Sequence, residues 1–442
     1  MFRKALFILL VSLSLTSCMT LADYDFSAIN YSLYEQNYEG AYNLVEADKK
    51  ILYGDKGQVL YDLDRGILSH YGKEYLRSNE ELSGAEQGIY DLYATSVTQT
   101  INSFLLNDTV VDYSGEVYED IYTNLFMALN YIHLDNMEEA FVEIRRFDNK
   151  LKFASEKYVD LIAAANEENM ANGGSSVEIP STEFHNSALA RYISMILYRS
   201  TGKLDSALVD KKYIDSAFLT QKKLYDFPKP KTIEEELQIP ASKARLNVIA
   251  FSGRSPIKRE EIIRLIFSED LYYKVAFPVM EKQYSGITSI DVTVTPLDNN
   301  NVPIESDLQK ISMEKIESIE NIAIDTFAQK QTLLYTKAIA RSLSKTVGSS
   351  LLGYAASETG NDIFSVLQLV SLFAIEATER ADVRTSRFFP GAAWVTGITL
   401  DPGEYRVTVQ YKNRSGKIVS SETEDLIVEK NSLNMVESVC LK

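Results

Sequence analysis

The sequence predicts an α+β multidomain protein. All-α helical repeats are expected over 18–240, and a β-rich, sandwich-like domain over 241–442 with a helical insertion at about 312–381. Its 442 residues exceed what one compact core usually organises. Residues 18–240 hold 37 acidic and 20 basic side chains, whereas 241–442 hold 25 and 23. Apolar residues recur at helical spacing before residue 240 and alternate with polar residues beyond it.

The first eighteen residues, MFRKALFILLVSLSLTSC, have the pattern of a secretory signal. Arg3 and Lys4 precede an apolar run that is too short for a membrane span. The ending Leu15-Thr16-Ser17-Cys18 resembles the lipobox of bacterial lipoprotein precursors. That resemblance implies a lipoprotein signal peptide over 1–17, cleavage before Cys18 and lipid attached to Cys18. The alternative is an ordinary signal peptide with a chance cysteine.

The helical part contains four segments with one pattern, two helices joined by a short polar turn. The clearest is 119–151, where Ala128 lies on the first helix, 134–136 form the turn and Ala140 lies on the second helix. This segment resembles a tetratricopeptide repeat, in which small residues let two antiparallel helices approach closely. Weaker copies are predicted over 28–50, 57–91 and 184–220, with turns at 35–37, 70–72 and 201–203. An irregular helical bundle is the alternative.

Two polar segments interrupt the helical pattern. Residues 166–182 are polar and glycine-rich, which predicts a mobile loop between hairpins. Residues 225–232 contain two prolines and lie where the charge balance changes. The domain boundary is therefore predicted near residue 240.

The second half reads as strands around a helical insertion. Strands are predicted over 244–253, 271–279 and 287–297, and again beyond Trp394. Helices are predicted over 313–347 and 362–381. The apolar stretch 363–377 is short for a membrane span. It predicts a buried core helix, with a surface that packs on membrane or a partner as the alternative.

Across most of its length the chain resembles a poorly characterised family of bacterial tetratricopeptide-repeat-containing lipoproteins. The likeness lies in the lipobox, the helical repeats, the β-rich C-terminal domain and three further passages. These passages are 186–214, 250–261 and 379–409. The resemblance implies no established activity. It implies that the protein acts together with other envelope lipoproteins, including activators of penicillin-binding proteins.

The sequence offers little for catalysis. The three histidines, His70, His133 and His185, have no second ligand at i+4, and each is predicted at a hairpin end or on the surface. The sequence therefore predicts no catalytic residue, no cofactor and no metal site. Cys440 is expected as a small apolar residue in a C-terminal strand. Binding of Cys440 to another chain is the alternative.

Three arginines, Arg380, Arg384 and Arg387, cluster beside Phe388-Phe389-Pro390 in the nearly neutral half. They are the candidate partner-docking residues. The cluster could face the acidic helical domain, or it could hold an acidic partner. Solvated loops are the plain alternative.

These features favour a non-enzymatic, lipid-anchored scaffold or adaptor that binds other envelope proteins or lipoproteins through its repeats. A role in cell-wall synthesis or outer-membrane assembly would fit. The alternatives are an envelope hydrolase, or a carrier of lipid or small molecules, in the C-terminal half. Acidity disfavours nucleic acid as a partner. Met19 after Cys18, by resemblance to sorting rules in common diderm bacteria, implies the outer membrane facing the periplasm.

Overall fold

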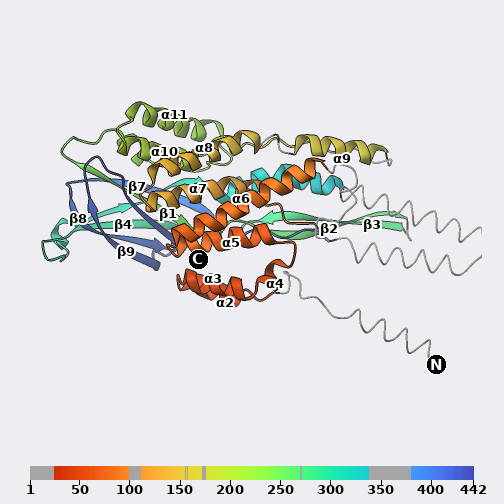
Figure 1. Ribbon diagram of the computed structural model, residues 1–442, viewed down its shortest axis with the longest axis horizontal. Helices are drawn as coiled ribbons and strands as arrows, with labels where there is room; N and C mark the ends of the chain where they lie inside the picture. The colour runs from red at the N-terminus through yellow and green to blue at the C-terminus, as the bar shows by residue number, and fades with distance from the viewer. Residues whose placement is uncertain are drawn as a thin grey trace, which may run out of the picture.

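The computed structural model describes residues 24–98, 111–154, 156, 158–171, 176–268, 271–337 and 380–442. Helices fill the N-terminal part and strands dominate the C-terminal part, which confirms the α+β prediction (Figure 1). The helices are α2 (Ser27–Tyr34), α3 (Tyr38–Ala47), α4 (Lys49–Tyr53), α5 (Gln58–Tyr71), α6 (Tyr75–Thr98), α7 (Val117–His133), α8 (Met137–Ala154), α9 (Val159–Ala171), α10 (Ala188–Ser200), α11 (Leu204–Thr220) and α12 (Thr232–Glu235). A further helix covers 319–337.

Four helix hairpins share one turn geometry. The paired helices are α2 with α3, α5 with α6, α7 with α8, and α10 with α11. In each three-residue turn the middle residue has positive φ, as at Gln36, Lys73, Asp135 and Gly202. The next amide then donates to a carbonyl of the preceding helix, for example from Asn136 to Tyr131 at 2.8 Å. This is the Schellman closure of a helix C-terminus.

The predicted turns at 35–37, 134–136 and 201–203 are confirmed. The turn expected at 70–72 was wrong by two residues, because α5 continues to Tyr71. The predicted loop at 166–182 was also wrong at its start, since α9 extends to Ala171. Helix-favouring alanines and glutamates in this stretch outweigh its polarity.

The strands form two four-stranded sheets and a ribbon. They are β1 (Ala244–Ser252), β2 (Ile257–Ser268), β3 (Leu271–Glu281), β4 (Ser289–Pro296), β5 (Gln309–Ser312), β6 (Glu314–Ser318), β7 (Ala392–Leu400), β8 (Gly403–Lys412), β9 (Ile418–Val428) and β10 (Asn434–Cys440). The central sheet has the order β10-β1-β7-β6, and the outer sheet β5-β4-β8-β9. β10 pairs with β1 in parallel, and β2 pairs with β3 as a long ribbon leading away from the sheets (Figure 1).

The central sheet lies between the helices and the outer sheet. Along β1, Leu246 and Val248 pack with the outer sheet, whereas Ile249 and Phe251 belong to the core shared with the helices. Burial on both faces explains why β1 is buried at every position. The core on the helical side therefore includes side chains from both sides of residue 240.

The helix predicted over 313–347 was wrong at its beginning. Residues Glu314–Ser318 form β6, which pairs with β7 at the edge of the central sheet and buries Ile316. A five-residue strand that contains glutamates and a lysine carries little β signal of its own. Most of the predicted insertion, 338–379, and with it the apolar stretch 363–377, lies outside the described residues. Within the described ranges, no helix has the length and apolarity that crossing a membrane requires.

Candidate functional site

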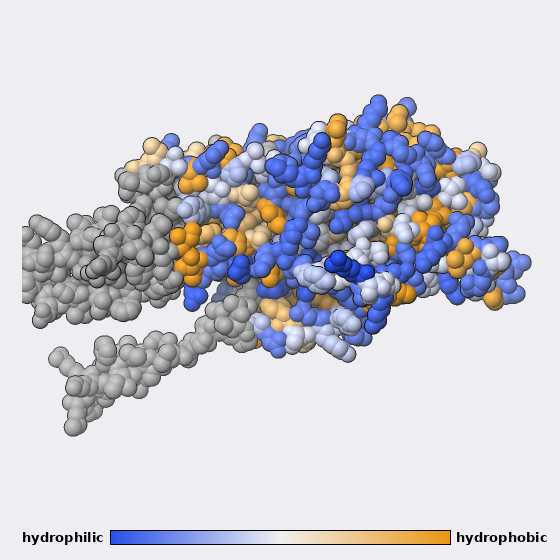
Figure 2. Space-filling view, turned by 180° about the vertical axis from the view of Figure 1, so that it is seen from behind, coloured by the Kyte–Doolittle hydropathy of each residue, from blue (hydrophilic) through white to orange (hydrophobic). Residues whose placement is uncertain are grey.

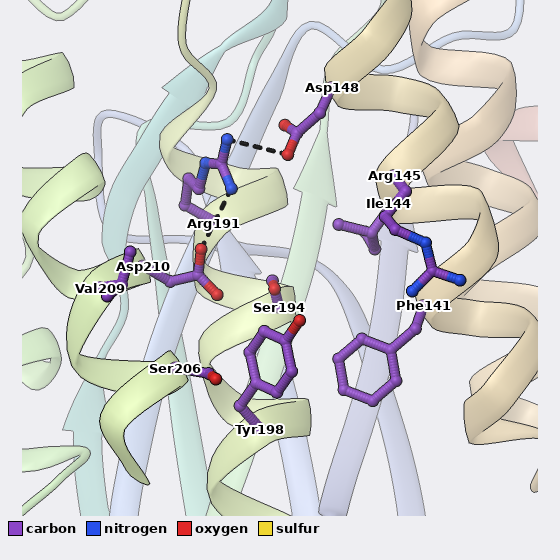
Figure 3. Close-up of a pocket in the computed structure, with 10 residues that line it drawn as sticks. All are labelled: Phe141, Ile144, Arg145, Asp148, Arg191, Ser194, Tyr198, Ser206, Val209 and Asp210. Carbon is purple, nitrogen blue, oxygen red and sulfur yellow. Dashed lines mark hydrogen bonds and ion pairs between the residues drawn. The ribbon is translucent and has the colours of Figure 1, made fainter. Parts of the chain in front are cut away.

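A groove opens between α8, α10 and α11 (Figure 3). Its cavity measures about 240 Å³. The residues that line it are Phe141, Ile144, Arg145, Asp148, Arg191, Ser194, Tyr198, Ser206, Val209 and Asp210. They come from two neighbouring hairpins, so the groove exists because the hairpins lie side by side.

Arg191 is the central charged group of the groove. Its Nη2 lies 2.8 Å from Oδ2 of Asp148, and its Nη1 lies 3.1 Å from Oδ1 of Asp210. The guanidinium also covers the ring of Tyr213 at 4.4 Å. One arginine therefore ties α8, α10 and α11 together and fixes the floor of the groove.

This ionic cluster is not fully satisfied. Nε of Arg191 is buried and has no hydrogen-bond partner within the part of the chain that the structure describes, whereas the carboxyl group of Asp210 is also stabilised by Ser194. Burial raises the pKa of both Asp148 and Asp210, while Arg191 acts in the opposite direction. Buried polar atoms without partners favour a ligand that supplies hydrogen bonds.

The rim of the groove is aromatic and cationic. The rings of Phe141 and Tyr198 lie 4.6 Å apart, and the ammonium group of Lys203 lies 5.8 Å from the Phe141 ring. Arg145 is exposed, and it has no ion-pair partner among the residues described. Two cations beside an aromatic pair can accept a carboxylate and an apolar side chain together.

The three arginines predicted as docking residues separate in the structure. Arg380 is exposed and lies 3.6 Å from Glu260 on β2. Arg384 pairs with Asp382 and donates to the backbone carbonyls of Lys56 and Val111.

Arg387 covers the ring of Phe26 at 3.9 Å. Its backbone amide and the hydroxyl of Ser386 donate to buried Asp64, whose pKa burial raises to about 7. Arg384 and Arg387 thus lie against the helical part, which was one of the alternatives. Their role in docking stays a prediction.

Sequence reasoning missed a second site, at the junction of helices and central sheet. Glu437 on β10 accepts from Nε2 of His70 at 2.6 Å and from Nε2 of His133 at 2.8 Å. Both histidines lie at hairpin ends, as predicted, but His70 is buried. Burial acts to lower the pKa of His70, yet Glu437 and Asn130 raise it above its ordinary value. Burial opposes ionisation of Glu437, but the two imidazoles hold its pKa below the usual range.

Glu317 on β6 forms a similar junction. It accepts hydrogen bonds from the hydroxyls of Tyr122, Ser187 and Tyr225 and from the amide of Leu189. Ser187 caps α10, so the carboxyl group lies at the positive end of that helix. Burial raises the pKa of Glu317 despite these donors. No local pattern in the sequence connects β6 with these helices.

The two cysteines differ in what the structure describes. Cys18 and the signal segment 1–17 lie outside the described residues. Cys440 is a free thiol buried in the core between the two sheets, and burial raises its pKa. Its expected place in a C-terminal strand is confirmed. Among the residues with described positions, no group of three acidic, histidine or cysteine side chains is placed to hold a metal ion.

No protein-family model, no curated protein and no solved structure matches this chain.

Proposed function

We propose that this protein is a lipid-anchored scaffold or adaptor of the bacterial cell envelope that binds other envelope proteins. Cys18 would carry the lipid and hold the protein at the outer membrane, facing the periplasm. The observation that carries the binding role is the groove between two neighbouring hairpins, with its unsatisfied floor and its cationic, aromatic rim. The proposed role is recognition, without an enzymatic reaction.

The repeated turns support a tetratricopeptide-like array. Four hairpins with equal three-residue turns stack in chain order, and small residues occur where their helices meet. Ala140 is fully buried, and the hydroxyl of Ser78 donates to the carbonyl of Gly66 at 2.7 Å. We propose in the same way that the two four-stranded sheets form the sandwich-like unit, since they share one apolar core.

The groove favours a protein segment that bears a carboxylate next to an apolar or aromatic side chain. Arg145 and Lys203 would attract the carboxylate, and Phe141 with Tyr198 would pack on the apolar group. A cavity of about 240 Å³ lined by Asp148, Arg191 and Asp210 is small and polar for an acyl chain. The groove therefore favours an adaptor over a lipid carrier.

Site-specific photo-crosslinking in intact envelopes tests the proposal. A photoreactive phenylalanine at Tyr198 should capture one recurring envelope protein, identified by mass spectrometry. Arg145→Glu should lower the yield of that product about tenfold, the effect of ~1.4 kcal/mol in affinity.

Matched controls come from the β-rich part of the chain, outside the elements that line the groove. The same probe at Tyr284, which is 92% exposed beyond β3, should not capture that protein. Arg414→Glu, an equal charge change in the turn between β8 and β9, should leave the Tyr198 product unchanged. Identical products from Tyr198 and Tyr284 would contradict the proposed groove.

The lipid anchor has its own test. Mass spectrometry of the mature protein should find acyl chains on Cys18, and Cys18→Ser should move the protein to the soluble fraction. Each buried methylene contributes ~0.8 kcal/mol, so several acyl chains hold a protein firmly. An unmodified Cys18 at the mature N-terminus would remove the membrane from the proposal and leave the groove standing.

A further inference from the structure

Helix α11 exposes an apolar face at the outer edge of the hairpin array (Figure 1). Leu204 is 55% exposed and Leu208 44%, and Val209 and Tyr213 are each nearly half exposed. Orange residues interrupt the hydrophilic surface along the upper edge in Figure 2, where this helix lies. A helix with apolar residues on its inner and outer sides is usually covered on both. The outer face of α11 therefore fits a further helix.

Two charged side chains lie in the same face. Asp205 and Lys212 are exposed, and neither has an ion-pair partner within the described residues. The neighbouring Lys211 differs, since it pairs with Asp215 and Glu234 of its own chain. Asp205 and Lys212 are two helical turns apart, so they mark the two ends of one short stripe.

We propose that α11 binds α11 of a second copy of this chain, antiparallel, about a two-fold axis beside Leu208 and Val209. An antiparallel pair centred there places Asp205 opposite Lys212 of the second copy, and Lys212 opposite its Asp205. Leu208 then lies beside Leu208 of the second copy on one flank of the charged stripe, and Val209 lies beside its Val209 on the other flank. The face is self-complementary in charge and in apolar content, as a two-fold interface requires.

The charges select this register over a shifted one. Sliding the helices by two turns, to centre the pair on Lys212, would oppose Lys212 with its own copy. Like charges across an interface are costly, whereas the proposed register gives two opposite-charge pairs. The interface comprises one helix from each chain, so its area is small and its affinity is expected to be micromolar.

The dimer would place two grooves on either side of its axis, because Val209 belongs to both the face and the groove lining. The pairing stands on α11 alone. Its tests use this chain alone and need no envelope partner in the groove.

A charge swap tests the pairing. The full chain, with Cys18→Ser, is measured by sedimentation equilibrium up to about 100 µM, a range that brackets a micromolar dissociation constant. Asp205→Lys and Lys212→Asp should each raise that constant about tenfold, since both symmetric pairs become repulsive. The double variant, which restores the pairs with reversed polarity, should return it to the original value. Lys222→Asp changes net charge as Lys212→Asp does but lies beyond α11, and it should have no effect.

Cysteine crosslinking tests the register. Leu208→Cys lies next to the proposed axis and should form a disulfide-linked dimer under mild oxidation. Leu219→Cys is more exposed on the same helix, but its two copies would be about 30 Å apart at a rise of 1.5 Å per residue, and it should not. A monomer at all concentrations, a double variant that fails to restore pairing, or equal crosslinking at the two positions would each overturn the proposal.

Discussion

The two faces of the central sheet are packed by different physical means. Toward the outer sheet, Leu246, Val248 and Val436 meet Val407 and Val409 in an apolar core. Toward the helices, apolar residues are joined by buried polar and charged groups. Glu437 holds His70 and His133, Glu317 holds three hydroxyls, and Glu236 holds Arg199 and Arg245.

The two faces differ in how strictly they determine which side chains can pack against them. An apolar interface tolerates exchange of side chains of similar volume, because any hydrophobic group of the right size fills it. A buried carboxylate requires partners at fixed positions, and removing one partner leaves a charge without compensation. The outer sheet is therefore held mainly by the apolar area that it buries. The helices are positioned by individual side chains.

Removing Glu437 should have the largest effect on this comparison. Glu437→Ala leaves His70 buried without its anion, and we expect a loss of ~3–5 kcal/mol in the free energy of unfolding. Urea denaturation followed by circular dichroism measures it. Glu424→Gln on β9 removes an exposed pair with Lys73 and should cost less than ~1 kcal/mol. Similar losses for the two variants would show that burial of the Glu437 cluster contributes nothing special.

His70→Gln should have an intermediate effect that depends on pH. Glu437 raises the pKa of His70 in the folded state. The contribution of the charged His70–Glu437 pair to the free energy of unfolding is therefore fully present below the unfolded pKa of about 6.5. That contribution is lost as pH rises through the folded-state pKa. We expect a loss of ~1.5–3 kcal/mol at pH 5.5, typical of hydrogen bonds to charged groups, and a smaller loss at pH 9. Denaturation curves at both pH values measure this loss in the free energy of unfolding. A loss that grows with pH would contradict a charged His70 paired with Glu437.

Ile290→Val, on the apolar side, should have the smallest effect. Ile290 on β4 is fully buried between the two sheets. Removing one methylene should cost ~0.5–1.5 kcal/mol, because the surrounding side chains close only part of the space. Since no titrating group takes part, thermal melts at pH 5.5 and pH 9 should give the same difference from the unaltered protein. A pH-dependent difference would mean that the faces are coupled.

The same contrast explains what could be predicted from the sequence. The hairpins were predictable because Ala128, Ala140 and the turn at 134–136 lie within one short segment. β8 was predictable because apolar and polar residues alternate along it, between turn-forming residues at 401–403 and 413–416. β6 was not, since a short edge strand is determined by its pairing with β7 and by few residues of its own.

The sites depend on contacts between distant segments. Asp148, Arg191 and Asp210 come from three helices, and nothing near any one of them indicates the other two. Glu437 lies more than 300 residues beyond His133. Charged residues ordinarily occupy the surface, so a sequence pattern assigns these carboxylates to solvent. Only the folded topology shows that they are buried.

The parallel pairing of β10 with β1 has a consequence for the order of events during synthesis. β1 can pair with β7 and the hairpins can form while the chain is still growing, but the other edge of β1 remains open until residues 434–440 exist. The carboxylate of Glu437, which binds His70 and His133, belongs to the same strand, β10. Contacts of such long sequence separation form slowly. The protein therefore completes its core only after residues 434–440 are made, and a chain that stops before β10 is left with an open sheet edge and an uncompensated buried histidine.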